Sequence, residues 1–412
     1  MKKSFLNSLG PGLLFAGAAI GVSHLVQSTK AGAEFGFGLL WALLLVHLFK
    51  YPFFQFGPRY AAATGETLLD GYKKLGKPVL AAYYIINFAT MFTIQAAVTI
   101  VTAGIASQLF GFTNDLVVWS VIIICISLFI LIIGKYKLLD NLMKYIIILL
   151  TISTVIAVSV ALFDTKESFN FTQILPSGTI EITFLIAFLG WMPAPLDISV
   201  WHSLWTLEKD KSIHLKTKPN QAIFDFNIGY LGALFLGVCF VVLGALVMYN
   251  SGETFSNNGG VFASQLINLY TKNLGSFFYI FIAIAAFTTM FSTTLTCLDA
   301  MPRVLTKIGM IWRDNNGSAL DSNAIVIKEK SVRRPRIIWL FVIATGALII
   351  LRFFITDMKQ MVNIATSFSF LTAPVLAILG IIVVKRQLPV NFWSKGKYII
   401  AYLGVAFLVI LG

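Results

Sequence analysis

Charged residues are scarce in this chain of 412 residues: Lys, Arg, Asp and Glu make up 12%, whereas hydrophobic residues make up 58%. The mean hydropathy is +0.84. A soluble protein of this length shows amphipathic helices or alternating strands. Here apolar stretches of about 20 residues recur from end to end, each long enough to cross a hydrocarbon core of about 30 Å. The composition excludes a soluble domain and predicts an all-α integral membrane protein.

Residues that carry enzymatic chemistry are scarce as well. The chain has four His and three Cys, and it contains no HExxH, phosphate-loop or nucleophile motif. The three cysteines lie in apolar segments at no metal-ligand spacing, which predicts free buried thiols. We expect no enzyme and no cofactor. No partner domain or signalling motif favours a membrane sensor either.

The apolar segments predict about eleven transmembrane helices in one polytopic domain, residues 1–412. A short additional helix is expected in TGETLLDGYKKL, between the second and third spans, and another in GKYKLLDNLMK, before the fifth. The connection 302–336 is polar and basic and is expected to be a surface loop. The predicted spans are 11–35, 37–57, 79–109, 115–134, 139–163, 180–206, 222–249, 273–298, 337–356, 360–384 and 397–412.

The net charge of +13 follows the loops of this topology. Of the 31 Lys and Arg, 25 lie at the N-terminus or in one alternate set of loops, and four lie in the other set. This bias is the positive-inside pattern, so we expect a plasma or inner membrane protein with a cytoplasmic N-terminus and an external C-terminus. The charge is no sign of a nucleic-acid partner. The basic set comprises 59–77, 135–144, 209–218, 303–336 and 385–397.

Two of the predicted spans carry helix-breaking residues at their centres. The first span has Gly21 followed by Val-Ser-His, and the sixth has Gly190, Pro193 and Pro195. Paired broken helices in corresponding positions of two halves point to a transporter's substrate site near the bilayer midplane. Because the two spans start on opposite sides, we expect an inverted five-plus-five repeat, 11–163 and 180–384, with 397–412 as an extra helix.

Four segments resemble the Nramp family of proton-coupled divalent-metal transporters. GPGLLFAGAAIGVSHLVQSTKAGAEFGF resembles its first helix, RYAAATGETL the segment after its second, GKYKLLDNLMK the entry to its fifth, and Met192-Pro193 its helix 6 break. The resemblance covers most of the chain and implies a LeuT-like fold with eleven helices. It also implies a central site between helices 1 and 6.

The metal ligands of the resembled family are largely replaced. That family reads Asp-Pro-Gly-Asn at the first break, where Asp and Asn ligate the metal, and this chain has Gly21, Val22, Ser23 and His24. At the second break the family reads Met-Pro-His, and this chain has Met192-Pro193-Ala194. The chain therefore resembles a divergent branch in which the first carboxylate is missing.

The candidate binding residues lie at these two breaks. We expect His24, Met192, the Ser23 hydroxyl and freed carbonyls near Gly21 and Gly190 to contact the substrate. Asp197 would supply the missing negative charge, and His24, Met192 and Asp197 are the candidate metal ligands. A structural alternative exists for two of them: Asp197 as a helix cap and His24 as a buried structural residue.

Three further polar residues belong to the predicted site. His47 and Lys50 lie one turn apart and join His24 and Asp197 as candidates for proton coupling. Lys50 could instead pair with a carboxylate, bind an anion or extend toward the interface. Thr366, in the tenth span, aligns with a polar position that completes the metal site of the resembled family.

Two functions remain open from the sequence. The first is a proton-coupled secondary transporter of a divalent metal such as Mn²⁺ or Fe²⁺. The second keeps the fold and carries a small organic solute or anion, because the metal-binding carboxylate is missing and Lys30 and Lys50 lie within spans. The expected partners are the transported ion or solute and the lipid bilayer, and the sequence gives no oligomeric state.

Overall fold

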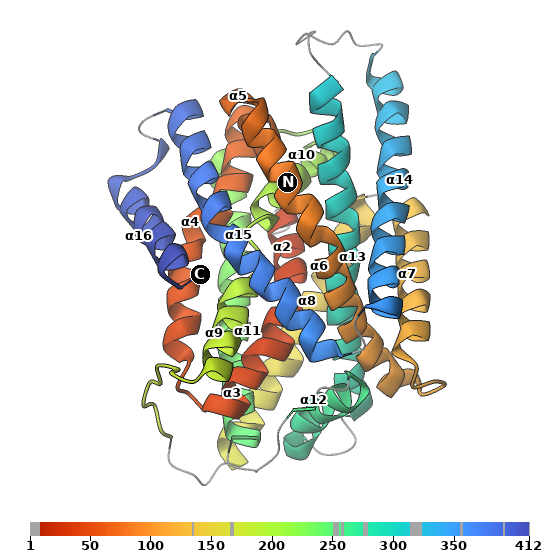
Figure 1. Cartoon of the computed structure of the whole chain (residues 1–412), viewed down its shortest axis with the longest axis vertical. Helices are drawn as coiled ribbons and strands as arrows, with labels where there is room; N and C mark the ends of the chain where they lie inside the picture. Colours follow the sequence, from red (N-terminus) through yellow and green to blue (C-terminus); the bar gives the residue numbers. More distant parts are fainter. Residues whose placement is uncertain are drawn as a thin grey trace, which may run out of the picture.

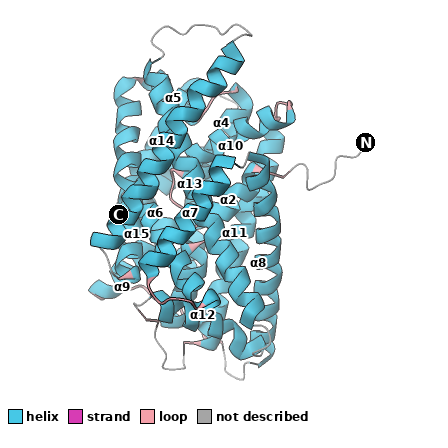
Figure 2. Cartoon of the chain, turned by 90° about the vertical axis from the view of Figure 1, so that its right-hand side faces the viewer, coloured by secondary structure: helices cyan, strands magenta, loops and turns pink. Residues whose placement is uncertain are grey.

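A computed structural model of the chain describes residues 9–133, 136–164, 169–249, 255–256, 259–274, 279–313, 324–354, 357–389 and 392–411. Within these ranges every regular element is a helix (Figure 2). The first expected span consists of α2 (Pro11–Ala19), the π-helix η1 (Val22–Ser28) and α3 (Thr29–Phe35). The sixth consists of α9 (Thr179–Trp191) and α10 (Ile198–Ile213). The other helices are α4 (Leu40–Thr64), α5 (Leu68–Leu75), α6 (Lys77–Phe110), α7 (Leu116–Ile133), α8 (Tyr136–Asp164), α11 (Pro219–Val247), α12 (Gly259–Leu274), α13 (Tyr279–Arg313), α14 (Ala324–Phe353), α15 (Met358–Gln387) and α16 (Lys395–Leu411).

The helices confirm an all-α integral membrane protein. Among the described residues, eight helical segments are long and apolar enough to cross a membrane. Large apolar side chains such as Phe129, Ile133 and Phe163 are exposed on α7 and α8. Such a surface suits a lipid environment. Cys125 is also exposed on α7, so the expectation of a buried thiol is wrong there, whereas Cys239 and Cys297 are buried. The count of eleven crossings stays a prediction.

Two expectations about the connections are wrong, and one helix there was not predicted. The segment 302–336 is mostly helical rather than a loop, because α13 continues to Arg313 and α14 already begins at Ala324; residues 314–323 lie outside the described part. No helix was predicted between the spans 222–249 and 273–298, but α12 (Gly259–Leu274) begins there. The residues before the fifth span form no separate helix, since α8 begins at Tyr136 and runs on without a break. Hydropathy identifies apolar cores but not polar helical extensions beyond them.

The two broken helices run in opposite directions. Figure 1 shows α2 on the side of α5 and α3 nearer α12, whereas α9 lies nearer α12 and α10 lies on the side of α5. Helix α11 packs extensively on α2, η1 and α3, and α10 packs on α4. Each break is therefore surrounded by helices, where protein groups can satisfy the freed backbone.

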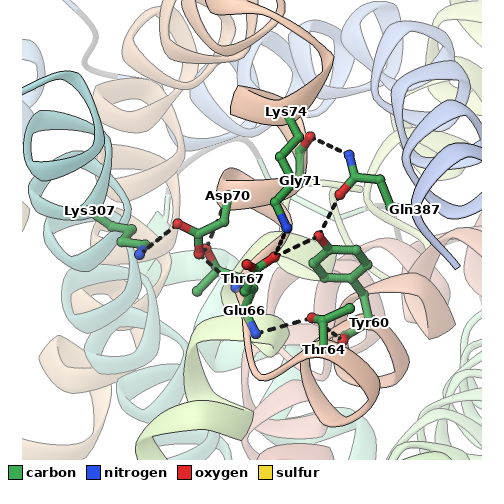
Figure 3. Close-up of polar contacts among 9 residues, drawn as sticks. All are labelled: Tyr60, Thr64, Glu66, Thr67, Asp70, Gly71, Lys74, Lys307 and Gln387. Carbon is green, nitrogen blue, oxygen red and sulfur yellow. Dashed lines mark hydrogen bonds and ion pairs between the residues drawn. The ribbon is translucent and has the colours of Figure 1, made fainter. Parts of the chain in front are cut away.

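The expected short helix after the second span is α5, and a polar cluster fixes it (Figure 3). Thr67 caps the helix: its side chain accepts a bond from the backbone N–H of Asp70, and its own backbone N–H donates to Asp70 Oδ2 at 2.8 Å. Lys307 of α13 pairs with Asp70 Oδ1 at 2.8 Å. Tyr60 donates to Gln387 Oε1 at 2.6 Å, which ties α4 to α15. We call this group the α5 polar cluster; its members are Tyr60, Thr64, Glu66, Thr67, Asp70, Gly71, Lys74, Lys307 and Gln387.

The charges of the α5 polar cluster support one another. Burial disfavours the ionised form of Asp70, but the ion pair with Lys307 and the bonds from Thr67 outweigh it and hold the pKa of Asp70 below its ordinary value. Glu66 pairs with Lys74, and Gln387 donates to the Gly71 carbonyl at 2.8 Å. Every polar side chain in this cluster has a partner.

Candidate functional site

The first break separates α2 from the rest of the first span. Helix α2 ends at Ala19, and the chain resumes as a π-helix at Val22 after Gly21. π-Helical turns within a helix are frequent at functional sites. Gly21 is close-packed, because a Cβ there would lie 2.3 Å from Thr293 Oγ1 of α13. A side chain at position 21 would therefore collide with Thr293.

The second break has a proline-based cause. Helix α9 ends at Trp191, and Met192 is extended and fully buried. The Met192–Pro193 peptide bond is cis. In a continuous helix the carbonyl of Leu189 would accept a bond from residue 193, and Pro193 has no N–H to donate. Lys50 of α4 donates instead to the carbonyls of Leu189 and Gly190, at 2.7 and 2.8 Å.

The two breaks meet at Ser23. Its hydroxyl lies 3.2 Å from the carbonyl of Pro193 and 2.5 Å from that of Ala19. Beside this contact is a cavity of about 20 Å³, enough for one water-sized group. Most side chains that line the cavity are apolar, and the Ser23 and Thr293 hydroxyls are the oxygen-bearing side chains among them. The residues lining the cavity include Ala19, Ser23, Trp191, Ala194, Pro195 and Thr293.

Two buried histidines lie next to each other behind the first break. The rings of His24 and His47 are 6.3 Å apart between centroids, in an edge-to-face arrangement. His24 Nδ1 is 3.0 Å from the Ala19 carbonyl and His47 Nδ1 is 2.7 Å from the Leu43 carbonyl. The Leu43 carbonyl only accepts, so His47 Nδ1 donates to it, whereas His24 Nδ1 also lies 2.8 Å from the Ser23 hydroxyl, and its role depends on the tautomer of the ring. Neither Nε2 has a partner.

Asp197 lies apart from these histidines. It occupies the N-cap of α10, close to the first-turn position expected, but its side chain makes no capping hydrogen bond. The carboxylate is 5% exposed, and its Oδ2 has no partner. Asp197 lines a second cavity, of about 10 Å³, together with Tyr72 of α5 and Ser199. The structure therefore places Asp197 between the breaks and α5.

Gly190 and Thr366 are brought together by close helix packing. A Cβ on Gly190 would lie 2.3 Å from the Thr366 carbonyl, so α9 can approach α15 only because residue 190 has no side chain. The Thr366 hydroxyl bonds back to the carbonyls of Val362 and Asn363. It is the backbone of Thr366, rather than its hydroxyl, that meets the second break.

Two residues at this site were missed by the sequence analysis. Thr293 of α13 packs on Gly21 and donates to the Gly17 carbonyl at 2.9 Å. Tyr230 of α11 donates to the His47 carbonyl at 2.6 Å. In the sequence, Thr293 is marked by a dense run of hydroxyl residues, STTLT at 292–296. No local signal marks Tyr230, which reaches α4 only through the tertiary fold.

The arrangement offers dispersed donors rather than a compact ligand cluster. Among the described residues, no group of three or more His, Cys, Asp and Glu side chains lies close enough to hold a metal ion. Met192 contributes a buried thioether, Ser23 a hydroxyl and His24 a free Nε2. Among the described residues at the second break, Asp197 provides a buried carboxylate and Lys50 of α4 a buried ammonium.

Known proteins show the same architecture. The Nramp family, described as natural resistance-associated macrophage protein-like, matches residues 12–412. The uncharacterized protein PM0681 of Pasteurella multocida is 36% identical over 385 residues, 92% of this chain and 85% of that protein. The divalent metal cation transporter MntH of Staphylococcus aureus is 26% identical over 262 residues, 61% of this chain and 57% of that protein.

A solved structure extends the likeness to the whole chain. The manganese transporter of Eremococcus coleocola aligns with a TM-score of 0.69 at 14% identity, over 100% of this chain and 87% of that one. The shared fold is LeuT-like. Because the family match spans residues 12–412, the chain belongs to the Nramp family of membrane transporters.

Proposed function

We propose that this protein is a proton-coupled secondary transporter of a divalent metal ion such as Mn²⁺ or Fe²⁺. The observation that carries the proposal is the meeting of two oppositely directed broken helices at Ser23 and Pro193, beside a cavity for one small group. Family membership and the named functions of two relatives, a divalent metal cation transporter and a manganese transporter, support the substrate class.

The substrate would bind near the bilayer midplane between the breaks. Met192, the Ser23 hydroxyl, His24 Nε2 and freed carbonyls near Gly21 would contact the ion. Gly190 and Thr366 would form the packed wall behind them. Asp197 would balance the positive charge of the ion from the side of α5. A thioether and an imidazole favour a softer ion than an all-oxygen site does.

Protons would move through the buried titratable groups. His24, His47 and Asp197 each have an atom without a partner in a buried position, which leaves room to take up or release a proton. Lys50 joins them as a charged neighbour of the second break. Intramembrane ionisable groups of this kind are costly and are retained for function.

The proposed topology follows the loop charges. The N-terminus and α5 would face the cytoplasm and the C-terminus the outside. The domain would consist of repeat one (11–163), an inverted repeat two (180–384) and the additional helix 397–412. The opposite direction of the two broken helices supports this arrangement (Figure 1).

A second candidate substrate is a small organic anion. Lys50 places a buried ammonium at the second break, with no carboxylate paired to it among the described residues. The described residues also hold no cluster of three metal-ligating side chains. A neutral or positive site of this kind favours a negatively charged solute over a dication.

A thermal-shift screen of the purified protein distinguishes the two substrates. Divalent metals and small organic acids are added separately, and the unfolding temperature is recorded, because a ligand that binds only the folded state raises it. The metal proposal expects a saturable rise with Mn²⁺ or Fe²⁺ that Met192→Ala abolishes. A rise with organic anions alone, with no metal response, contradicts it and selects the second candidate.

A further inference from the structure

Lys50 is a fully buried cation held by backbone oxygens. It lies within α4 with an exposed fraction of 0%, and its Nζ is 2.7 Å from the Leu189 carbonyl and 2.8 Å from that of Gly190. Within the described ranges no carboxylate pairs with it. A charge inside a membrane protein costs several kcal/mol by the lower scales unless it is compensated. The compensation here comes from carbonyl dipoles.

Those two carbonyls are free because of the sequence of the second break. The Leu189 carbonyl faces the position of Pro193, which has no N–H, and the Gly190 carbonyl lies beyond the last hydrogen-bonded turn. The C-terminal end of α9 also carries the negative end of its helix dipole. In transporters built on broken helices, such ends with their unwound carbonyls bind the coupling cation.

We propose that Lys50 is a tethered cation that occupies the coupling-ion position at the end of α9. Its ammonium takes the two carbonyl ligands that a free cation would otherwise use. The protein then needs no free cation at this position. The carbonyls of Leu189 and Gly190 are likewise withdrawn from any metal substrate, which would be held by groups of the first break and Met192.

The tether also links the two halves of the domain. Helix α4 carries the ammonium and α9 carries the carbonyls, while Gly190 packs against the Thr366 backbone on the opposite side. The end of α9 is thus fixed between α4 and α15. This role rests on the two contacts of Lys50 with the end of α9 and does not require that the substrate is a metal.

Chemical rescue of a truncated lysine tests the proposal without a transport assay. Lys50→Ala removes three methylene groups and the ammonium, a space that propylammonium fits. We expect the unfolding temperature of the purified full-length variant to fall by about 5 °C. Propylammonium chloride should restore at least half of this loss saturably, and tetramethylammonium, which has no N–H, should restore none. The unfolding temperature of the wild-type protein should not change with propylammonium, because the Lys50 side chain already fills this space.

A lysine on the protein surface supplies the matched control. Lys395 at the start of α16 is exposed, so Lys395→Ala should show neither the loss nor the rescue. Wild-type stability in Lys50→Ala, or equal recovery with both ammonium ions, overturns the proposal. If Lys50→Ala yields no folded protein, Lys50→Met replaces it in the test, because methionine keeps most of the side-chain volume without the charge. Near-wild-type stability of Lys50→Met contradicts a tethered cation, and a clear loss of stability supports it.

Discussion

Polar groups are paired in the partly exposed α5 polar cluster and are left without partners in the buried interior between the broken helices. In the cluster, Asp70 has both a cap partner and Lys307. In the interior, His24 Nε2, His47 Nε2 and Asp197 Oδ2 have no partner. A buried group without a partner costs about 1–3 kcal/mol. The pairing in the cluster stabilises the fold, whereas the unpaired groups of the interior cost stability, which agrees with the transport role proposed for them.

The largest difference between the two regions is expected in transport, on substitution of Asp197 in the interior. Asp197→Asn keeps the shape and removes the charge, so the carboxylate that we propose for the proton and the metal is lost. Uptake driven by a proton gradient should fall at least about tenfold, while the unfolding temperature stays equal or rises. Proteoliposome uptake and a thermal melt on the same preparation measure both. Normal uptake with reduced stability would make Asp197 a structural residue.

The next effect is a gain of metal affinity at the first break. Gly21→Asp alone places a side chain against Thr293 Oγ1, and we expect poor stability. Gly21→Asp with Thr293→Ala removes the two nearest atoms, Thr293 Oγ1 and Cγ2, and leaves the Cβ of residue 293 at 2.9 Å. A small shift of the backbone then admits the carboxylate, which should raise Mn²⁺ affinity about tenfold or more. The Mn²⁺-induced thermal shift measures it. The matched control is Gly21→Asn with Thr293→Ala, which has the shape without the charge; an equal gain there would contradict the explanation.

A steric test addresses the packing of the second break. Gly190→Ala places a methyl group 2.3 Å from the Thr366 carbonyl, so α9 and α15 must separate. We expect a loss of about 1–3 kcal/mol in stability. A Cβ added to Gly232 in α11 would lie in open space, so Gly232→Ala should be neutral or slightly stabilising. Denaturant unfolding compares them, and a tolerated Gly190→Ala would show that the contact is not tight.

The smallest effect is expected in the α5 polar cluster. Asp70→Asn should cost about 1 kcal/mol or less, because the pair with Lys307 is partly exposed, and transport should persist. The pKa of Asp70 in the folded protein lies below its ordinary value of 3.8. The ionised carboxylate therefore stabilises the fold fully above about pH 5, and this stabilisation is lost as the pH falls through 3.8 and below. Melts of wild type and Asp70→Asn from pH 7 to 3 should converge at the acid end. A constant difference would assign the effect to packing.

The helices and their interruptions could be predicted from the sequence, whereas the side-chain contacts around the interruptions could not. Apolar length, Pro193 and the small residues near Gly21 are local signals, and they identified the membrane helices and both interruptions. Partners across the bundle leave no such signal. Nothing local shows that Thr293 fills the space beside Gly21 or that Lys50 reaches the Leu189 carbonyl. The polar extension of α13 to Arg313 was missed because hydropathy reports lipid contact rather than helix length.

Metal uptake into proteoliposomes tests the central claim most directly. Wild type, Met192→Ala and Asp70→Asn are reconstituted at equal density, and Mn²⁺ entry is followed with an inward proton gradient. The account predicts saturable uptake by wild type and by Asp70→Asn, with Met192→Ala strongly reduced. The absence of Mn²⁺ and Fe²⁺ flux in folded wild-type protein, together with flux of an organic anion, would contradict it.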